Sequence, residues 1–234
     1  MKQLLFCAYQ GTKNSGDVTR QAAQAVAKML DCDYAEWEVD QLVEGYERTI
    51  ESVLKRQLNW EKDDLTRQNI QARVRAPGIW MFANLRNGLL LSTSNRSEAA
   101  VGYATMDGDT AGGVSPIAGI DKDYLRTWLR WMETTGLPET GPYPALSLIN
   151  EQQPTAELRP KADKQTDEGD LMPYGVLDTI ERWLRVQGLW QALVNVFIGG
   201  EIAKTMPQEA QRFQKVHKAW QKIMERANEQ RNLI

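Results

Sequence analysis

The residues best suited to chemistry lie between Leu89 and Gly119, where polar, acidic and glycine residues are concentrated. An apolar run at Leu89–Leu91 precedes four small polar residues, Ser92–Asn95, which offer hydroxyl, amide and backbone N–H groups. A short helical pattern then begins at Ser97-Glu98 and ends in the acidic turn Met106–Asp109. A strand, a polar turn and a helix start in this order form the nucleotide-binding edge of open α/β sheets. The sequence therefore predicts a nucleotide site in this stretch.

The surrounding elements predict a doubly wound parallel sheet. Strands are expected at Leu4–Ala8 and Ala35–Val39, and Leu89–Leu91 has the continuous apolar character of a central strand buried on both faces. Helical patterns alternate with these strands, which favours parallel pairing with helices on both faces. The expected helices begin after Asp17, run from Leu42 to Leu54 and from Thr66 to about Leu85, and begin again after Asp121.

Two loops and the C-terminal part differ from this pattern. The segment Gly136–Gly169 is rich in proline and has no sustained period, which is typical of a functional lid or a disordered loop. The loop Gly11–Asp17 has neither GxGxxG nor a Walker-type motif, so we expect a solvated turn there. From Pro173 onward only helical patterns occur. We therefore predict an α/β domain over residues 1–185 and an α-helical C-terminal tail over residues 186–234.

Composition excludes several classes of function. The net charge is −3, which does not favour nucleic acid or an anionic membrane as a partner. The apolar runs are too short for a membrane span or a secretory signal, so we expect a cytoplasmic protein. With one histidine and two cysteines, a bound metal would have to be held by oxygen. We assign no catalytic role to His217, which lies on an amphipathic C-terminal pattern.

Four motifs together carry a family resemblance. They are QNIQARVR (68–75), LSTSNRSEAAVGYATMDGDTAGGVSPIAG (91–119) with Lys122, PTAELRP (154–160) and QTDEGDLMPY (165–174). In this order and spacing the chain resembles NAD synthetases over roughly residues 1–185, particularly the synthetase portion of the glutamine-dependent kind. The resemblance implies an adenine-nucleotide α-hydrolase or ATP-pyrophosphatase-like fold and a carbon–nitrogen ligase that uses ATP and Mg²⁺. ATP would adenylate the nicotinate carboxylate of deamido-NAD, and ammonia, free or from a glutaminase domain or subunit, would displace AMP.

The resemblance also assigns roles at the adenylation centre. Thr93 and Thr155 match family threonines at the ATP or adenylate phosphates; the alternative is that their hydroxyls cap turns. Glu98 matches a metal-binding glutamate, and this fits the preference of Mg²⁺ for one or two carboxylates plus phosphate oxygens. Its alternative role is that of a helix N-terminal acid. Lys122 matches a catalytic lysine that neutralises charge on the reacting groups.

Three further residues match the deamido-NAD site of the family. Asn69 and Arg73 lie four positions apart and are expected on one helical face. Asp109 matches a family aspartate, and its alternative is a plain turn acid. Arg75 points elsewhere on the same helix, so we expect a structural role for it.

The helix expected between Asn69 and Leu85 predicts a homodimer. Ile79, Trp80 and Phe82 give it more apolar surface than one sheet face needs. In the family resembled, deamido-NAD binds across the subunit interface. We therefore expect the interface to be built around this helix.

The chain departs from the family at its beginning. Family members carry an SGGxDS turn after their first strand, which grips the ATP pyrophosphate and supplies a second metal-binding aspartate, and these residues are not in the sequence. The strand at Leu4–Ala8 corresponds to the second strand of the family. One interpretation is a synthetase domain whose N-terminal unit lies upstream of Met1, and the other is a catalytically incomplete remnant that binds deamido-NAD or only dimerises. Either way, we expect turnover by these 234 residues alone to be near background.

Overall fold

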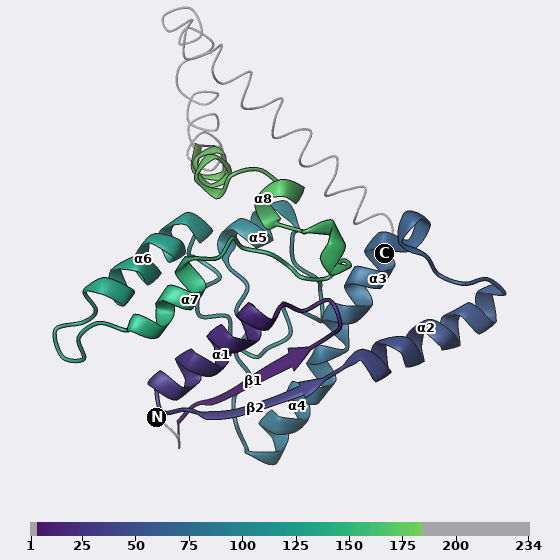
Figure 1. Cartoon of the computed structure of the whole chain (residues 1–234), viewed down its shortest axis with the longest axis horizontal. Coiled ribbons are helices and arrows are strands. Elements are labelled where there is room, and N and C mark those ends of the chain that lie inside the picture. Colours follow the sequence, from purple (N-terminus) through teal and green to yellow (C-terminus); the bar gives the residue numbers. More distant parts are fainter. Residues whose placement is uncertain (1–3, 184–234) are drawn as a thin grey trace, which may run out of the picture.

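The computed structural model describes residues 4–183 and shows a mixed α/β fold. Two parallel strands, β1 (Phe6–Gly11) and β2 (Asp33–Glu38), pair with Phe6 opposite Asp33. Helix α1 (Asp17–Met29) joins them, so this part of the chain is one βαβ unit (Figure 1). The predicted parallel pair and its connecting helix are confirmed. The strands begin two residues later and two residues earlier than the sequence pattern indicated.

Helices cover both faces of the β1–β2 pair. Helix α1 contacts both strands on one face. On the other face, α4 (Arg75–Leu85) places Phe82 against the sheet, with its ring centroid 5.0 Å from that of Phe6 and 5.3 Å from that of Trp37. Such stacked aromatic pairs add stabilisation beyond their buried area. This packing fixes α4 under the strands and thereby positions the helix that precedes it.

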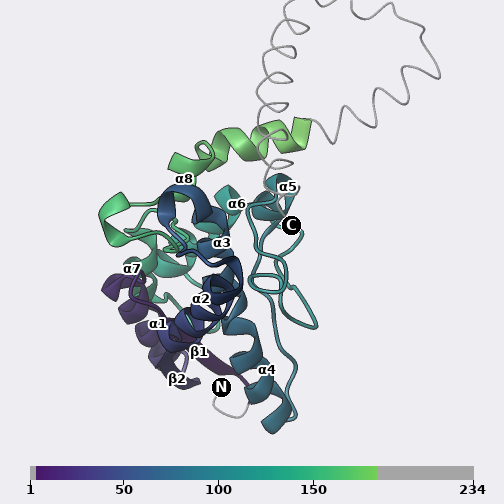
Figure 2. The same cartoon turned by 90° about the vertical axis from the view of Figure 1, so that its right-hand side faces the viewer.

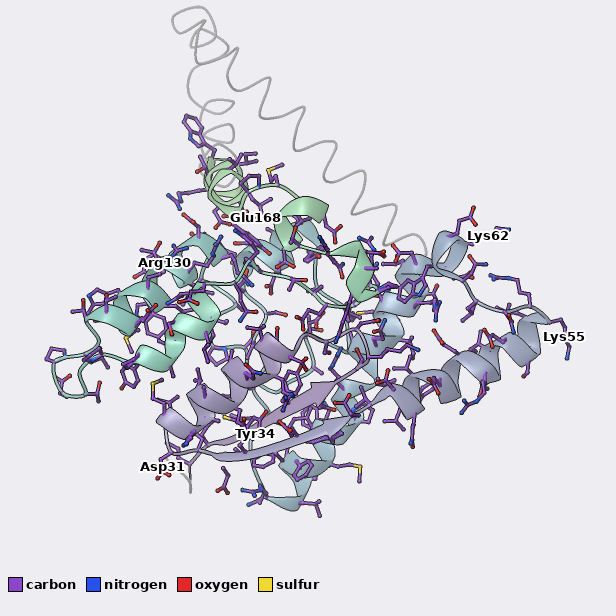
Figure 3. All side chains as sticks on the ribbon, viewed as in Figure 1. Asp31, Tyr34, Lys55, Lys62, Arg130 and Glu168 are labelled. Carbon is purple, nitrogen blue, oxygen red and sulfur yellow. The ribbon has the colours of Figure 1, made fainter. Side chains whose placement is uncertain are left out.

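The long helix predicted from Thr66 to Leu85 is wrong in two respects. It begins earlier, because the Asn59 side chain accepts the N–H of Lys62 and caps α3 (Trp60–Arg73). It also ends at Arg73, and α4 starts afresh at Arg75. Pro77 explains the break, because proline has no N–H to donate to the carbonyl four residues before it and tolerates only the first turn of a helix. Helix α2 (Asp40–Leu54) projects from the sheet, with Lys55 directly after its end and Lys62 in the first turn of α3 (Figure 3).

The second half of the described chain is mostly loop with short helices. Its elements are α5 (Arg96–Val101), α6 (Lys122–Thr134), η1 (Pro144–Leu146), α7 (Ser147–Asn150), η2 (Lys161–Asp163) and α8 (Asp167–Asp170). Residues 174–183 are helical and lie across the end of the molecule beside α8 (Figure 2). Val101, Tyr174 and Leu177 form a buried cluster there, separate from the cluster of Val39, Val43 and Val74 beside the sheet. The segment between 136 and 169 lacks a long helix or strand, as its sequence predicted, but it is built of short helices joined by loops.

The prediction of Leu89–Leu91 as a central strand is wrong. Within residues 4–183 the run makes only an isolated parallel bridge, between Leu91 and Val114, and does not pair with β1 or β2. Leu89 is 66% exposed and Leu91 42% exposed, while Leu90 alone is buried. An apolar run predicts burial on both faces only where neighbouring strands cover it. The described part of the chain provides no such neighbours.

The loop between β1 and α1 also differs from its prediction. It is not a solvated turn, because Thr12 is 5% exposed and Asn14 8% exposed. Their polar side chains bond to α3 and to the loop before η2.

The predicted C-terminal tail, residues 186–234, and His217 lie outside the described residues. Among the described residues, no helix is both long and apolar enough to cross a membrane.

Candidate functional site: a polar cavity beside an acid–lysine pair

A polar cavity of about 210 Å³ opens between α3, the turn after α5, the loop before η2 and the end of α8. Its polar wall contains the amides of Gln68 and Asn69, the guanidinium of Arg159, and the carboxylates of Asp109 and Asp170. These groups come from segments far apart in the sequence. A concave site with a few convergent polar groups is the usual form of a small-molecule site.

The turn between residues 105 and 109 brings Asn69 and Asp109 to this cavity. The hydroxyl of Thr105 donates to Asn69 Oδ1 at 3.0 Å, and its backbone N–H donates to Asp109 Oδ2 at 2.7 Å. The Ser92 and Ser94 hydroxyls donate to the backbone oxygen of Asp109 at 2.9 and 3.2 Å. The carboxylate of Asp109 is therefore also a turn acid, the alternative that its sequence position left open.

Arg73 lines a different cavity from Asn69. Its Nε donates to the backbone oxygen of Met106 at 3.1 Å, so both side chains hold the same turn. Arg73, however, lines a second cavity of about 610 Å³ together with Tyr46 and Trp80. Asn69 and Arg73, predicted to share one helical face, therefore hold the same turn, but each lines a different cavity.

Arg75 ties α4 to the end of β1, as its predicted structural role requires. Its Nε donates to the backbone oxygen of Gln10 at 2.9 Å, and its Nη1 to that of Gln71 at 2.8 Å. Burial lowers the pKa of the Arg75 guanidinium, with nearby acids acting in the opposite direction.

Glu98 and Lys122 form an ion pair between α5 and α6. Lys122 Nζ lies 2.9 Å from Glu98 Oε1. The other oxygen of Glu98 accepts the N–H of Asn95 at 3.1 Å, while Asn95 Oδ1 accepts the N–H of Glu98. This reciprocal capping box starts α5. The structural alternative for Glu98 is therefore real: one carboxylate oxygen caps α5, and the other pairs with Lys122.

The backbone of Lys122 is fixed by a buried acid. Its N–H donates to Ser97 Oγ at 2.8 Å, and the Ser97 hydroxyl donates to Asp178 Oδ1. The other oxygen of Asp178 accepts the N–H of Asp123 at 2.9 Å. Burial raises the pKa of the Asp178 carboxyl despite the hydrogen bonds from Ser97 and Asp123, which lower it. This network holds the first turn of α6 against α5.

Thr93 and Thr155 are the two threonines that the sequence predicted at the phosphates. Thr93 is exposed in the turn before α5. The Thr155 hydroxyl donates to the backbone oxygen of Gln165 at 2.7 Å and accepts the N–H of Glu157 at 3.2 Å, so it organises its own loop. Within residues 4–183, no hydrogen bond or ion pair joins either threonine to Glu98 or Lys122.

Sequence reasoning missed the residue that closes one side of the cavity. Arg159 pairs with Asp64 of α3 at 2.8 Å and with Asp170 of α8 at 2.8 Å. Burial alone would raise the pKa of Asp170, but hydrogen bonds from Gln165, Arg159 and Tyr103 outweigh it and lower that pKa. Arg159 and Asp170 lie in the motifs PTAELRP and QTDEGDLMPY, which located the segment but not the pairing.

A second missed network joins the end of β1 to the site. Asn14 Nδ2 donates to Gln71 Oε1 at 2.9 Å and to the backbone oxygen of Leu158 at 3.2 Å. Gln71 Nε2 also donates to that oxygen, at 2.7 Å. These buried polar groups bond one another across three segments, so the loop after β1, α3 and the segment around Leu158 are held in one arrangement.

The donor set fits a magnesium ion only in part. The described residues contain no group of three or more His, Cys, Asp or Glu side chains that could hold a metal ion. Glu98 offers one carboxylate beside a lysine. Mg²⁺ is commonly bound by one or two carboxylates plus substrate phosphates and water, so Glu98 fits an ion that arrives with a nucleotide.

A parallel βαβ unit with polar loops gathered beyond its first strand is the architecture of α/β nucleotide-binding domains. The family model of NAD synthase matches residues 6–224. The chain therefore belongs to the NAD synthase family.

Solved structures agree with this assignment. A glutamine-dependent NAD(+) synthetase from Cytophaga hutchinsonii is 48% identical, with a TM-score of 0.62 over 76% of this chain and 26% of that one. The fold is also that of an Acinetobacter baumannii glutamine-dependent NAD+ synthetase in complex with ADP, at 18% identity and a TM-score of 0.52, over 91% of this chain and 36% of that one.

Curated relatives extend beyond the chain. The glutamine-dependent NAD(+) synthetase of Thermotoga maritima is 35% identical over 167 residues, which are 71% of this chain and 27% of that protein. The chain thus spans about a quarter of the length of such relatives. A separate similarity is to dynein axonemal heavy chain 8 of Homo sapiens, 60% identical over 57 residues, or 24% of this chain and 1% of that protein. So short a share of that protein carries no functional conclusion.

Proposed function

We propose that this chain provides the deamido-NAD side of an NAD synthetase site. The reaction is the ATP-dependent amidation of deamido-NAD to NAD through an adenylated intermediate, with ammonia as nitrogen donor. Family membership and the names of the relatives support this reaction. The observation that carries this proposal is the cavity in which Asn69 and Asp109 converge beside the side chain of Arg159. Amide, carboxylate and guanidinium groups together suit the hydroxyl and phosphate groups of a dinucleotide.

Glu98 and Lys122 would act on the reacting groups. Glu98 would hold Mg²⁺ together with nucleotide phosphates, and Lys122 would neutralise charge that develops during adenylation and amide formation. Thr93 and Thr155 would contact ATP or adenylate oxygens. Mg²⁺ supplies electrostatic stabilisation of the phosphoryl groups when it is bound.

Deamido-NAD binding by calorimetry tests the proposal with a matched pair of variants. Asp109→Asn removes the charge that faces the cavity, and we expect about tenfold weaker binding, because hydrogen bonds to charged groups contribute about 1.5–3 kcal/mol. Asp107→Asn is the control, since this acid lies in the same turn but lines the second cavity. Asp107→Asn should bind within about twofold of the unmodified chain, well inside the tenfold step of 1.4 kcal/mol. Unchanged binding by Asp109→Asn, or none by the unmodified chain, would refute the assignment.

The rate of NAD formation should distinguish an active synthetase domain from a catalytically incomplete remnant. The SGGxDS pyrophosphate grip is not among these 234 residues, so we expect weak ATP binding and ammonia-dependent NAD formation near background. Losing a single positioned donor already costs about 10²–10³ in rate. Robust turnover would show that the loop between β1 and α1 grips the phosphates. Binding of deamido-NAD without turnover would favour the catalytically incomplete form.

We also propose a homodimer, with an interface wider than the helix first expected. On α2, Tyr46 and Ile50 are 55% and 46% exposed, and on α4 Trp80 and Met81 are 40% and 63% exposed. Tyr46 and Trp80 line the second cavity together, so exposed apolar side chains of α2 and α4 meet at this cavity. Exposed apolar surface of this kind marks an interaction site.

Light scattering across a concentration series tests the dimer. Ile50→Lys should shift the mass toward the monomer, because it places a charge in the apolar surface. Arg48→Ala, an exposed neighbour outside that surface, is the control and should leave the mass unchanged. A monomeric mass for the unmodified chain at tens of micromolar, where micromolar complexes form, would contradict the proposal.

A further inference from the structure

Lys122 lies against Tyr174, which bonds to a second acid that the assignments above leave without a role. The ammonium of Lys122 is 5.6 Å from the ring centroid of Tyr174, a cation–π contact. The Tyr174 side chain is fully buried, and its hydroxyl donates to Asp167 Oδ2 at 2.9 Å. Asp167 is 4% exposed, and its Oδ1 is a buried oxygen without a hydrogen-bond partner.

Two acids, Glu98 and Asp167, interact with the single ammonium group of Lys122. Lys122 pairs with Glu98, and it also acts on the Asp167 carboxyl, whose pKa burial raises while the Tyr174 hydrogen bond and Lys122 lower it. A buried carboxylate with one oxygen unpaired is costly unless a cation compensates it. Lys122 pairs with one of these acids and contacts the ring of Tyr174, whose hydroxyl bonds the other.

A cation bound at Glu98 would compete with Lys122. Oε2 of Glu98 accepts the N–H of Asn95 and Oε1 pairs with Lys122, so a cation bound at Oε1 shares that oxygen with the ammonium. Repulsion between the two positive charges then favours movement of the ammonium away from Glu98. The backbone of Lys122 is fixed by Ser97, so only the side chain can reorient. The ammonium already contacts the ring of Tyr174, and the hydroxyl of that side chain bonds Asp167.

We propose that Asp167, with Tyr174, is a positioning residue that retains the Lys122 ammonium at the site when Glu98 is occupied by another cation. The catalytic use of Lys122 rests on the proposed function. The retention itself is a property of the apo chain and is testable without nucleotide or metal.

Glu98→Gln imitates the loss of the Glu98 charge, and NMR of the ¹⁵N-labelled lysine ammonium groups reports on Lys122. We expect hydrogen exchange of the Lys122 ammonium to stay within about threefold of the unmodified chain in Glu98→Gln. It should rise about tenfold further in Glu98→Gln/Asp167→Asn, as loss of a hydrogen bond to a charged group predicts. The matched control is Glu98→Gln/Asp170→Asn, because Asp170 lies on the same short helix but bonds Tyr103 and Arg159.

Equal exchange in Glu98→Gln with and without Asp167→Asn would overturn the proposal, as would the same increase with Asp170→Asn. If Asp167→Asn does not fold, Lys122→Met replaces it. In the Glu98→Gln background, Lys122→Met should still lower Tm by about 2–4 °C, the shift for about 1 kcal/mol in a domain of this size. No further fall would show that Glu98 was the sole partner of Lys122. Because neither measurement uses deamido-NAD, their failure is distinct from failure of the proposed function.

Discussion

Gly112→Ala should destabilise the site turn by overpacking. An added Cβ at Gly112 would lie 2.6 Å from the backbone nitrogen of Ser92 and 3.1 Å from the carbonyl carbon of Leu91. Both contacts are with backbone, which cannot move aside as a flexible side chain can. The N–H of Ser92 donates to the Val114 oxygen at 2.8 Å, so a displacement there breaks the bridge between the two segments.

The adjacent Gly113 offers a matched control. A Cβ at Gly113 would meet Leu89 Cδ1 at 3.0 Å, the end of a side chain that is 66% exposed and free to turn away. Neither glycine has a positive φ, so alanine can adopt both backbone conformations. Any difference between the two variants therefore comes from packing alone.

The expected magnitudes separate the variants clearly. Replacing glycine by alanine stabilises by about 0.4–1 kcal/mol through the unfolded state, and this gain is common to both variants. Overpacking at Gly112 costs about 1–3 kcal/mol, so the two variants should differ by about 2 kcal/mol. That difference corresponds to about 4–8 °C in Tm for a domain of this size.

Thermal unfolding followed by tryptophan fluorescence measures this difference. Deamido-NAD binding should weaken in Gly112→Ala as well, because Ser92 also holds the backbone of Asp109. Equal melting temperatures for the two variants would refute the reasoning, since the bridge would then tolerate a side chain.

Two further variants test the buried polar contacts. Gln71→Leu should lower the free energy of unfolding by about 2 kcal/mol, because it removes a partner of the buried Asn14 amide, and urea unfolding with an unchanged m-value would measure this. An unchanged urea midpoint would show that Asn14 finds another partner. Asp170→Asn tests a pH dependence. The folded pKa of Asp170 lies below its ordinary value of 3.8, so the stability it contributes is present above that pH and is lost as pH falls through the folded pKa. Asp170→Asn should therefore cost about 1–2 kcal/mol at pH 7, through its bonds to Arg159 and Tyr103, and progressively less in acid. A cost that is the same at pH 7 and in acid would contradict this sign.

Several local predictions are confirmed because local chemistry controls them. The periodic patterns predicted helices after residue 17, between residues 42 and 54, and after Asp121, and α1, α2 and α6 occur there. Asp121 caps α6 by accepting the N–H of Tyr124 at 2.9 Å. One local signal was overlooked. The sequence Asn95-Arg96-Ser97-Glu98 is a capping box and could have located the start of α5 without a structure.

Contacts between distant segments were not predictable in the same way. The pairing of Arg159 with Asp64 joins residues 95 positions apart, and the hydrogen bond of Asn14 to Leu158 joins residues 144 apart. Composition and periodicity carry no information on such pairings. The motif resemblance marked the segments and assigned Glu98 and Lys122, but not the buried acid Asp167 next to them.

The sequence by itself determined the family, the helices with clear caps and the segments that bear the site residues. Each of these depends on residues within one or two turns of one another or on a recognisable motif. Only the tertiary structure decided that Leu89–Leu91 stays outside the β1–β2 sheet, that Asn69 and Arg73 line different cavities, and that the loop after β1 buries Thr12 and Asn14. The physical reason is that burial and polar pairing depend on which distant surfaces meet, and one stretch of sequence does not specify its partner.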